Sequence, residues 1–502
     1  MLWNQLHSKS QSRSKRVVVR FQQLTLYRTR YTWRCAGNQS VALTSRGHVR
    51  TRFSGVASIL LLWGSCTAHA ELRASVARVD ITPKTHEPMW GFEDRTDPST
   101  GTLDPLYARI LVVEAGGKRI AIVALDLGRS FGEPLLDHLK EVVSKSSGIS
   151  CLLVSATHTH GAPVIKDEYE GAPPEWEQRA LDGIAAAIKN AADHLQEVRI
   201  GTGTGSVFIG HNRLHVNEDG TVRWFERNPT MVPTAGVDPT VTVLRIDDRN
   251  GFPLAILTNY ACHPVVFGSD NSQYTADYPA VTNRFVEKVF GGSVQSFFLQ
   301  GADGEINPYY AVTPVKENAV KWRDWTGEQL GQEVVNVAKG IQTANDPSAS
   351  IEFREETLHL KLRWDAEQFR AALIKTFGAK ALEQWGAPIR PVVDARVSAV
   401  LIDKQIAIIA IPGEPFVDFQ ESWRARCPVS TSLFFGYTNG YHGYFPTISA
   451  ASRGGYGAAS ASTWVELGAG ERMVDWALIQ TYQMMGKYSI LPDDLTKGAY
   501  SK

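Results

Sequence analysis

The stretch Cys151-Leu-Leu-Val-Ser-Ala-Thr157 runs directly into His158-Thr159-His160, so an apolar, strand-like segment ends in two histidines that are two residues apart. Side chains at positions i and i+2 of a strand point to the same side. Neutral imidazole is a common zinc ligand, so the segment predicts a metal ligand and a neighbouring proton carrier that face one cavity. The alternative is a pair of strand-end histidines without a metal, and the rest of the chain bears on that choice.

Apolar β-branched runs alternate with amphipathic stretches along the chain, which is typical of an α/β protein. We expect an α/β fold with a mixed or parallel buried sheet and flanking helices, formed as one large domain over 71–502. The segment 345–391, bracketed by turn residues and without candidate ligands, is expected to act as a joint. Strands are expected at 120–125, 151–155, 241–246, 254–259, 294–299 and 406–411, and helices at 175–195, 278–290, 322–341, 366–385, 415–426 and 472–485.

The composition is that of a globular protein with an uneven charge distribution. The chain has 502 residues, of which 43% are hydrophobic, and can therefore bury a large core. The first 52 residues contain eleven Lys or Arg and no Asp or Glu, which leaves 41 basic against 52 acidic residues in the remainder. Because nucleic-acid binding needs a clustered basic surface, this acidic body argues against a nucleic-acid partner.

Residues 1–70 are interpreted as a basic leader and secretory signal peptide, with the apolar run Gly55–Trp63 before a cleavage site at Ala68-His69-Ala70. The leader is unusually long, so a translation start assigned too far upstream is the alternative. No segment reaches the roughly 20 apolar residues of a membrane span. We expect an exported protein, periplasmic or extracellular, without a transmembrane span but with room for peripheral membrane contact.

Cysteine usage gives no disulfide framework. After cleavage Cys151, Cys262 and Cys427 remain, an odd number without Cys-x-x-Cys spacing. The first two lie in apolar runs, where a free cysteine usually acts as a small hydrophobic residue.

Four further polar residues follow apolar runs or lie in loops, where functional groups gather. His263 follows the run 254–262, and Glu414 follows the run 407–413. Tyr444 and Tyr456 lie in a loop region rich in glycine and aromatic residues. Each has a structural alternative, since His263 can be a core histidine, Glu414 can complement a helix dipole and the tyrosines can be packing residues.

Taken together, these segments resemble the neutral, non-lysosomal ceramidase family, whose members are zinc-dependent amidases. The matching segments occur in the family's order over most of residues 71–470, and order and spacing together make the match specific. They are Ala77-Arg-Val-Asp-Ile-Thr-Pro83, Met89-Trp-Gly-Phe92, Leu106-Tyr-Ala-Arg109, Val123-Ala-Leu-Asp-Leu127, Ala156-Thr-His-Thr-His160, Asn212-Arg213, Asn259-Tyr-Ala-Cys-His-Pro264, 298–308, Ile411-Pro-Gly-Glu414 and 437–447.

The resemblance implies the roles of the candidate residues and one Zn²⁺ per chain. His160 matches a second active-site histidine that can pass a proton to the leaving amine. Arg213 and Tyr456 match polar residues that orient the amide or stabilise the oxyanion. The implied zinc ligands are His158, His263, Glu414 and Tyr444, a set with an open, net-positive character.

The sequence departs from the family's pattern at three places. Thr275-Ala276-Asp277 stands where the family has Ser-Gly-Asp, so the implied catalytic hydroxyl is that of Thr275; threonine still donates and accepts hydrogen bonds, but its χ1 is restricted. Gly161-Ala162-Pro163 alters the segment after the histidines, which implies a differently shaped entrance. The resemblance also implies the catalytic N-terminal domain only, without the β-sandwich domain that follows it in the family.

The resemblance therefore implies a zinc-dependent hydrolase that cleaves the N-acyl bond of ceramide, or of a related acylated lipid or other small acyl amide, by metal-activated water. Two alternatives stay open, because a fold does not choose a substrate. One is a zinc amidase or esterase of the same fold acting on a substrate that is not a sphingolipid. The other is a non-catalytic binding protein that keeps the metal.

Two further segments with acidic residues each allow two interpretations. Asp303, Glu305 and Asn307 place oxygen side chains at alternate positions, which suggests either a second cation site or a polar turn. Asp126 ends a buried run, where it either orients His158 from behind or caps the next turn.

Overall fold

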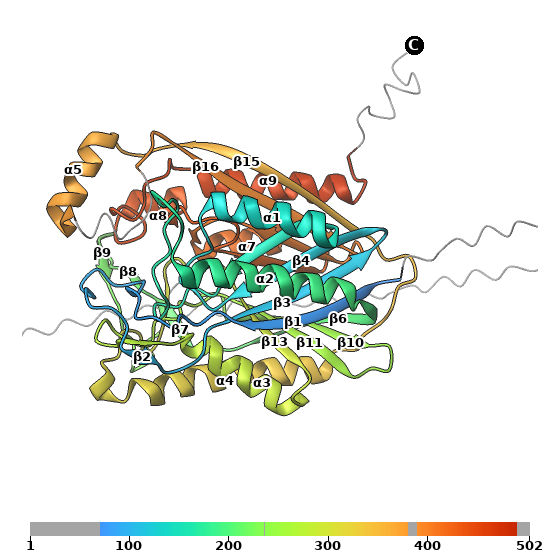
Figure 1. Ribbon diagram of the computed structural model, residues 1–502. Coiled ribbons are helices and arrows are strands. Elements are labelled where there is room, and N and C mark those ends of the chain that lie inside the picture. Colours follow the sequence, from blue (N-terminus) through green and yellow to red (C-terminus); the bar gives the residue numbers. More distant parts are fainter. Residues whose placement is uncertain (1–70, 235, 380–388, 489–502) are drawn as a thin grey trace, which may run out of the picture. The chain divides into compact units, whose positions relative to one another are not determined.

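Two β-sheets stacked between layers of helices form the core of the structure, a computed structural model that describes residues 71–234, 236–379 and 389–488 (Figure 1). The predicted leader and signal peptide lie outside the described residues. The first sheet has the order β13-β11-β10-β6-β1-β3-β4-β5, and the second has the order β15-β16-β17-β19. The strands of the first sheet are β1 (Arg73–Asp80), β3 (Tyr107–Ala115), β4 (Lys118–Leu125), β5 (Ile149–Ala156), β6 (Gln196–Ser206), β10 (Thr240–Asp248), β11 (Pro253–Tyr260) and β13 (Gln295–Gln300), and those of the second are β15 (Ile351–Lys361), β16 (Val392–Ile402), β17 (Ile406–Ala410) and β19 (Thr431–Phe435).

Both sheets are mixed. The pairs β4–β5, β11–β13 and β17–β19 are parallel, and the remaining neighbours are antiparallel. Because successive side chains of a strand point to opposite faces of the sheet, the core is divided into a part between the two sheets and parts between a sheet and its helices. In β4, Ile120 and Ile122 face the second sheet, whereas Ala121 and Val123 face helices. Strands β3, β4, β10, β11 and β17 are buried along most of their length, which explains their largely apolar sequences, whereas β1 and β6 at the middle of the first sheet are partly exposed.

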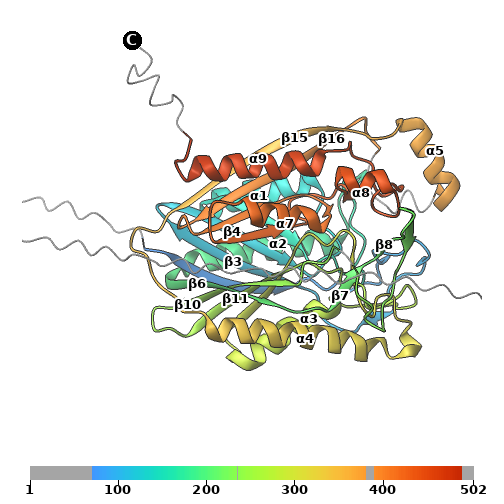
Figure 2. The same cartoon turned by 180° about the vertical axis from the view of Figure 1, so that it is seen from behind.

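Helices cover the outer face of each sheet (Figures 1 and 2). Two pairs lie on the first sheet, α1 (Glu133–Ser147) with α2 (Glu175–Asp193), and α3 (Asp277–Phe290) with α4 (Ala319–Gly340). On the second sheet lie α7 (Val417–Arg426) and α9 (Ala469–Met484). The short helices α5 (Ala366–Phe377) and α8 (Ile448–Arg453) begin at Asp365 and Thr447, whose side chains accept hydrogen bonds from backbone N–H groups of the first turn.

The predicted α/β fold with a mixed buried sheet and flanking helices is confirmed, and all six expected strands are present. The expected helices are also present, within the described residues, with shifted ends. The second sheet and helix α1 were not predicted from the sequence. The segment 345–391 does not act as a joint, because β15 pairs with β16 along its whole length, from Ile351 with Ile402 to Lys361 with Val392.

The two edge strands of the first sheet meet at their C-terminal ends. The twist of the sheet brings β13 back towards β5, and the Gln300 side chain at the end of β13 donates to the carbonyl of Thr157 just after β5, at 3.1 Å. The loop after β19 joins the same place, since the Asn439 side chain accepts from the Val154 N–H (2.9 Å) and donates to the Leu152 carbonyl (2.8 Å). Strand ends from both sheets therefore converge on one point.

Glu177, in the first turn of α2, is a fully buried carboxyl that makes the stability of the fold depend on pH. Burial raises its pKa to about 7 from an ordinary 4.5, against the hydrogen bond from Tyr169 and the charge of Arg129. The folded chain therefore holds this proton more tightly than the unfolded chain, and the free energy of unfolding falls as pH rises from about 4.5 to about 7. We expect Glu177→Gln to remove up to about 3 kcal/mol of that fall. Denaturant unfolding of the wild type and of Glu177→Gln at pH 5 and pH 8 measures this difference. Equal losses of unfolding free energy between the two pH values in both proteins would contradict the prediction.

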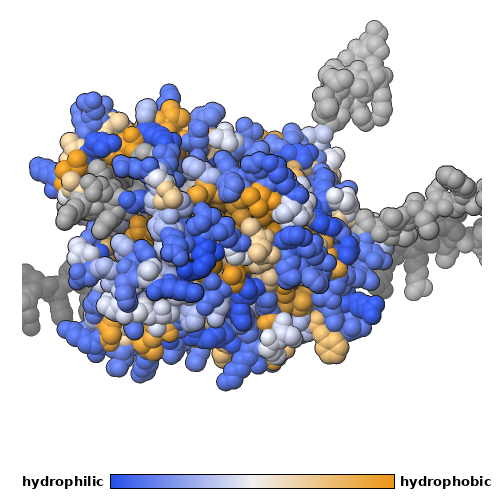
Figure 3. All heavy atoms as spheres, viewed as in Figure 1, coloured by the Kyte–Doolittle hydropathy of each residue, from blue (hydrophilic) through white to orange (hydrophobic). Residues whose placement is uncertain are grey.

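The described helices include none that is both long and apolar enough to cross a membrane. The face that carries α1 and α2 is mainly hydrophilic, with apolar residues gathered in small groups (Figure 3).

Candidate metal centre and pocket

His158 lies just beyond the end of β5 and is held in a left-handed backbone conformation, with φ of +68°. The histidine pair is therefore in a turn and not in a strand, as the i and i+2 argument had assumed. The rings of His158 and His160 nevertheless meet, with centroids 5.1 Å apart. Such a conformation costs energy in a residue with a side chain, and such residues cluster at functional sites.

Hydrogen bonds fix the orientation of His158 and His263. Nδ1 of His158 lies 2.6 Å from the Gly128 carbonyl, and Nδ1 of His263 lies 2.8 Å from the Asp303 carbonyl. A carbonyl oxygen only accepts, so each Nδ1 carries the proton, and each Nε2 of a neutral ring presents a lone pair. Gly128 thus fills the orienting role for which Asp126 was considered, while Asp126 accepts from the Tyr107 N–H.

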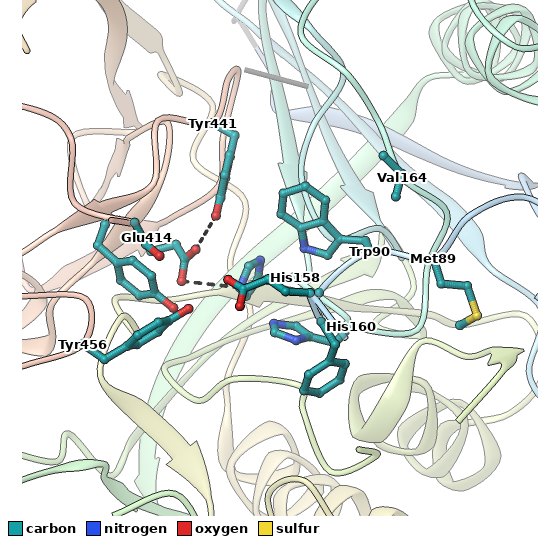
Figure 4. A pocket seen from close by; sticks show the side chains of 13 residues that line it. Met89, Trp90, His158, His160, Val164, Glu414, Tyr441 and Tyr456 are labelled. Atoms are coloured by element: carbon teal, nitrogen blue, oxygen red, sulfur yellow. Dashed lines mark hydrogen bonds and ion pairs between the residues drawn. The ribbon is translucent and has the colours of Figure 1, made fainter. Parts of the chain in front are cut away.

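Glu414 lies between these two imidazoles. It follows β17 and belongs to the short strand β18 (Glu414–Pro415). Its Oε2 is 3.5 Å from His158 Nε2 (Figure 4) and 3.3 Å from His263 Nε2, and all three side chains are at most 3% exposed. Burial alone would raise the pKa of Glu414 and lower that of His158, but their mutual attraction reverses both shifts.

This arrangement fits a divalent cation such as zinc. Two nitrogen lone pairs and a carboxylate oxygen point at one buried position, where they repel one another unless a proton or a metal cation lies between them. Nitrogen and carboxylate oxygen are the donors that zinc accepts in catalytic sites. In the described part of the chain, His158, His160 and His263 form a group whose ligand atoms lie within 4.8 Å of one another.

His160 lies beside this centre but lacks the anchoring of the other two histidines. Its buried Nδ1 has no hydrogen-bond partner among the described residues, whereas a ligating histidine usually donates its second N–H. The backbone of Gly91, with φ of +108°, lies so close that a Cβ there would come within 2.5 Å of the ring. Burial and the neighbouring imidazoles hold the pKa of His160 well below its ordinary value, which keeps the ring neutral.

Tyr444 lines the pocket beside Glu414 and is held by Arg213, which is not among the lining residues. Tyr444 in β20 (Tyr444–Phe445) pairs with Glu414 across two parallel strands, and its hydroxyl accepts a 2.7 Å hydrogen bond from Arg213. The Arg213 guanidinium also donates to the Gly304 carbonyl (2.6 Å) and to Asn307 Oδ1 (3.1 Å). The Tyr456 ring lies 5.5 Å from that of Tyr444 and 5.2 Å from the Arg213 guanidinium carbon.

A pocket opens onto the centre (Figure 4). Aromatic rings and the metal-site side chains form its walls, and Glu93 and Ser462 add polar groups. Its lining residues are Met89, Trp90, Gly91, Phe92, Glu93, His158, His160, Val164, Glu414, Tyr441, Tyr444, Tyr456 and Ser462. Of the predicted site residues, His158, His160, Glu414, Tyr444 and Tyr456 line the pocket, while His263 contacts Glu414 and Arg213 contacts Tyr444. That Tyr444 is a fourth metal ligand stays a prediction.

Three tyrosines of the loop after β19 reach three different partners. The Tyr437 hydroxyl donates to Asp303, at 2.6 Å, and its ring stacks on His158 with centroids 4.1 Å apart. The Tyr441 hydroxyl donates to Glu414, and Tyr444 is held by Arg213. Tyr437 and Tyr441 were not among the predicted site residues. The predicted loop contained them, but no sequence signal separates the three tyrosines.

Thr275 is placed behind the histidine turn and is not among the residues that line the pocket. Its hydroxyl donates to the buried Asp104, which also accepts from Arg323 at 2.6 Å and from Arg284 at 2.9 Å. Its backbone pairs with the turn, since its N–H donates to the Gly161 carbonyl and its carbonyl accepts from the Thr159 hydroxyl (2.7 Å). These contacts describe a residue that supports the turn.

The direct catalytic role predicted for Thr275 stays a prediction, which substitution tests. We expect Thr275→Ala to lower the free energy of unfolding by about 1–3 kcal/mol, because Asp104 loses a donor, and to reduce kcat/KM less than tenfold. Thr275→Ser should remain close to wild type in both. A thousandfold loss of turnover in a Thr275→Ala protein of wild-type stability would instead establish direct participation of the hydroxyl.

The alternate oxygen side chains at 303–307 do not form a cation site. Asp303 Oδ1 accepts from Tyr437, Glu305 accepts from the backbone N–H of Val417 at the start of α7, and Asn307 accepts from Arg213. Their different partners confirm the polar-turn interpretation.

Comparisons with known proteins point to one family. Residues 73–311 match the family described as neutral/alkaline non-lysosomal ceramidase, N-terminal. Neutral ceramidases of Drosophila pseudoobscura pseudoobscura and Drosophila melanogaster are each 26% identical, over 50% and 48% of this chain and 38% and 36% of their own lengths. The chain thus spans well under half of these relatives.

A structural match extends over most of the described chain. The neutral ceramidase from Pseudomonas aeruginosa superposes with a TM-score of 0.67 at 18% identity, covering 84% of this chain and 77% of the other. A ceramidase complexed with C2 gives a TM-score of 0.65 at 17% identity, with the same coverage. At this identity the match establishes the fold, and the family match assigns residues 73–311 to the neutral/alkaline non-lysosomal ceramidase family.

Proposed function

We propose that this chain is a zinc-dependent amidohydrolase that cleaves the N-acyl bond of ceramide or a related acylated lipid. The observation that carries the proposal is the convergence of two imidazole lone pairs and one carboxylate oxygen on a buried point at the base of a pocket. A zinc ion bound there supplies Lewis-acid chemistry and lowers the pKa of water towards about 7. The names of the family and of its relatives support ceramide as the substrate class.

His160 is suited to move the proton. Its ring is neutral at ordinary pH, because its pKa is held low, and it has a free Nδ1. It accepts a proton from the attacking water and returns it to the amine nitrogen as the C–N bond breaks, so that the amide yields a carboxylic acid and an amine.

The two tyrosines Tyr444 and Tyr456 are suited to hold the amide carbonyl. Tyr444 and Tyr456 line the pocket, and the charge and hydrogen bond of Arg213 fix the direction of the Tyr444 hydroxyl. A fixed donor next to the carbonyl oxygen stabilises the negative charge that develops there during attack. Arg213 therefore acts through Tyr444, as a positioning residue.

The test is fatty-acid release from a short-chain fluorescent ceramide by the purified full-length protein, with chelator and then with added zinc. The proposal expects release that disappears with chelator and returns with zinc. A panel of matched N-acyl amino acids, N-acyl amino sugars and simple esters identifies the substrate class. Hydrolysis of a panel compound but not of ceramide would show that the substrate is not ceramide. Zinc-loaded protein that hydrolyses nothing in the panel would contradict the proposal that the chain is an enzyme.

Export remains part of the proposal, as predicted from residues 1–70. Fractionation of cells that produce the full chain, with sequencing of the mature N-terminus, tests it. Cleavage next to Ala70 is the expected outcome, and an unprocessed chain in the cytosolic fraction would contradict it.

A further inference from the structure

The two carboxylate oxygens of Glu414 have different surroundings. Oε2 faces the Nε2 atoms of His158 and His263, at 3.5 and 3.3 Å. Oε1 points the other way and accepts a hydrogen bond from the Tyr441 hydroxyl (Figure 4). One oxygen is thus free for a cation, while the other is already engaged by a neutral donor.

We propose that Tyr441 is a positioning residue that makes Glu414 a one-oxygen metal ligand. This inference rests on the metal site of the proposed function. A carboxylate can bind a cation through one oxygen or through both, and a strong hydrogen bond to one oxygen favours the first mode. Binding through one oxygen keeps a coordination position open for water, which a catalytic zinc site needs and a closed structural site lacks.

The Tyr441 ring is held in place independently of Glu414. Trp90 meets it edge-on, with centroids 5.3 Å apart and planes at 88°. The guanidinium carbon of Arg129 lies 5.0 Å from the ring centre, and Arg129 is 1% exposed and paired with Asp167. A cation over an aromatic face and an edge-to-face ring pair both restrict the ring.

The backbone on either side of the ring is also anchored. The Asn439 side chain makes hydrogen bonds to the backbone of β5, the strand that leads to His158. The Gly440 N–H donates to the Ser130 hydroxyl, at 2.8 Å, and the His442 N–H donates to the Pro412 carbonyl, at 2.9 Å. Because these contacts set the position of the hydroxyl, Tyr441 directs Glu414 and is not merely carried along with it.

The test is Tyr441→Phe, which removes the hydroxyl and keeps the ring that contacts Trp90 and Arg129. We expect zinc affinity, measured by competition with a chromophoric chelator, to fall about tenfold, as for other residues that orient metal ligands. The visible spectrum of the Co²⁺-substituted protein should weaken, because Glu414 is then free to add its second oxygen and raise the coordination number. The matched control is Tyr260→Phe, a buried tyrosine whose hydroxyl donates to the Val207 carbonyl, and it should change neither measurement.

A double-mutant cycle separates action through Glu414 from a general loss of structure. In a Glu414→Ala background, Tyr441→Phe should have no further effect on metal affinity. Equal affinity and an unchanged Co²⁺ spectrum in Tyr441→Phe, or an undiminished effect in the Glu414→Ala background, would overturn the inference while leaving the metal site intact. Wild-type protein that binds neither zinc nor Co²⁺ would overturn the proposed function and this inference with it. Melting temperatures of the metal-free proteins verify that each variant folds.

Discussion

Alanine at His158 or His263 is expected to abolish zinc binding and to reduce hydrolysis more than a thousandfold, whereas alanine at His160 should leave zinc bound and still remove most of the hydrolysis. The difference follows from the hydrogen bonds. His158 and His263 are each anchored at Nδ1 by a carbonyl and aim Nε2 at Glu414. His160 has no such anchor and therefore serves proton transfer, which contributes about 10²- to 10⁴-fold.

Zinc content of the dialysed variants and kcat/KM on the hydrolysed substrate measure this prediction. The matched control is His211→Ala, because His211 is also buried and bonds the Phe225 carbonyl outside the pocket. This control should keep its zinc. Loss of zinc in His160→Ala together with retention in Glu414→Ala would instead assign the metal to the three histidines.

Replacement of Arg213 by methionine should reduce kcat/KM by about 10²- to 10³-fold, the usual cost of losing a donor that stabilises developing charge. The Tyr444 hydroxyl, the Gly304 carbonyl and Asn307 all lose their donor. Burial raises the pKa of Tyr444, and the Arg213 charge opposes that rise, so the variant also loses the charge that makes the Tyr444 hydroxyl a better hydrogen-bond donor. The free energy of unfolding should fall by about 3 kcal/mol, because buried polar groups are left unpaired.

Steady-state kinetics and denaturant unfolding of the same preparations separate the two effects. Arg245→Met is the matched control, since Arg245 is largely buried, pairs with Asp247 and is not among the residues that line the pocket. It should lose stability but keep its turnover. Arg213→Lys should recover only part of the activity, because an ammonium group cannot donate to the three acceptors in the geometry of the planar guanidinium. Arg213→Met with turnover within threefold of wild type would contradict the positioning role.

Local pattern predicted the strands well and the second sheet poorly. The runs at 120–125, 151–155 and 406–411 are apolar because both of their faces are buried, and that is visible in the sequence. Which strands share a sheet depends on distant pairing, such as β15 with β16, and charged residues on the exposed side of β15 hid its membership. Helix α1 was overlooked although Leu136, Leu139 and Val143 show its buried face at helical spacing.

The site was predictable only in part, for a similar reason. His158, His263 and Glu414 each follow within four residues of an apolar strand, so their positions carried a signal. The turn conformation of His158 and the separate partners of Tyr437 and Tyr441 carried none, because they depend on Gly128, Asp303 and Glu414, which lie far away in the chain.

The meeting of β5 and β13 at the Gln300–Thr157 contact has a consequence for folding. His263 and Glu414 are 151 positions apart in the chain, and Tyr444 and Arg213 are 231 apart. The metal site therefore depends on contacts between residues that are distant in sequence, and it exists only after these long-range contacts have formed. A cation that binds this site binds only the folded state and therefore raises the free energy of unfolding by mass action. The metal content of a preparation would then count the molecules that have completed folding.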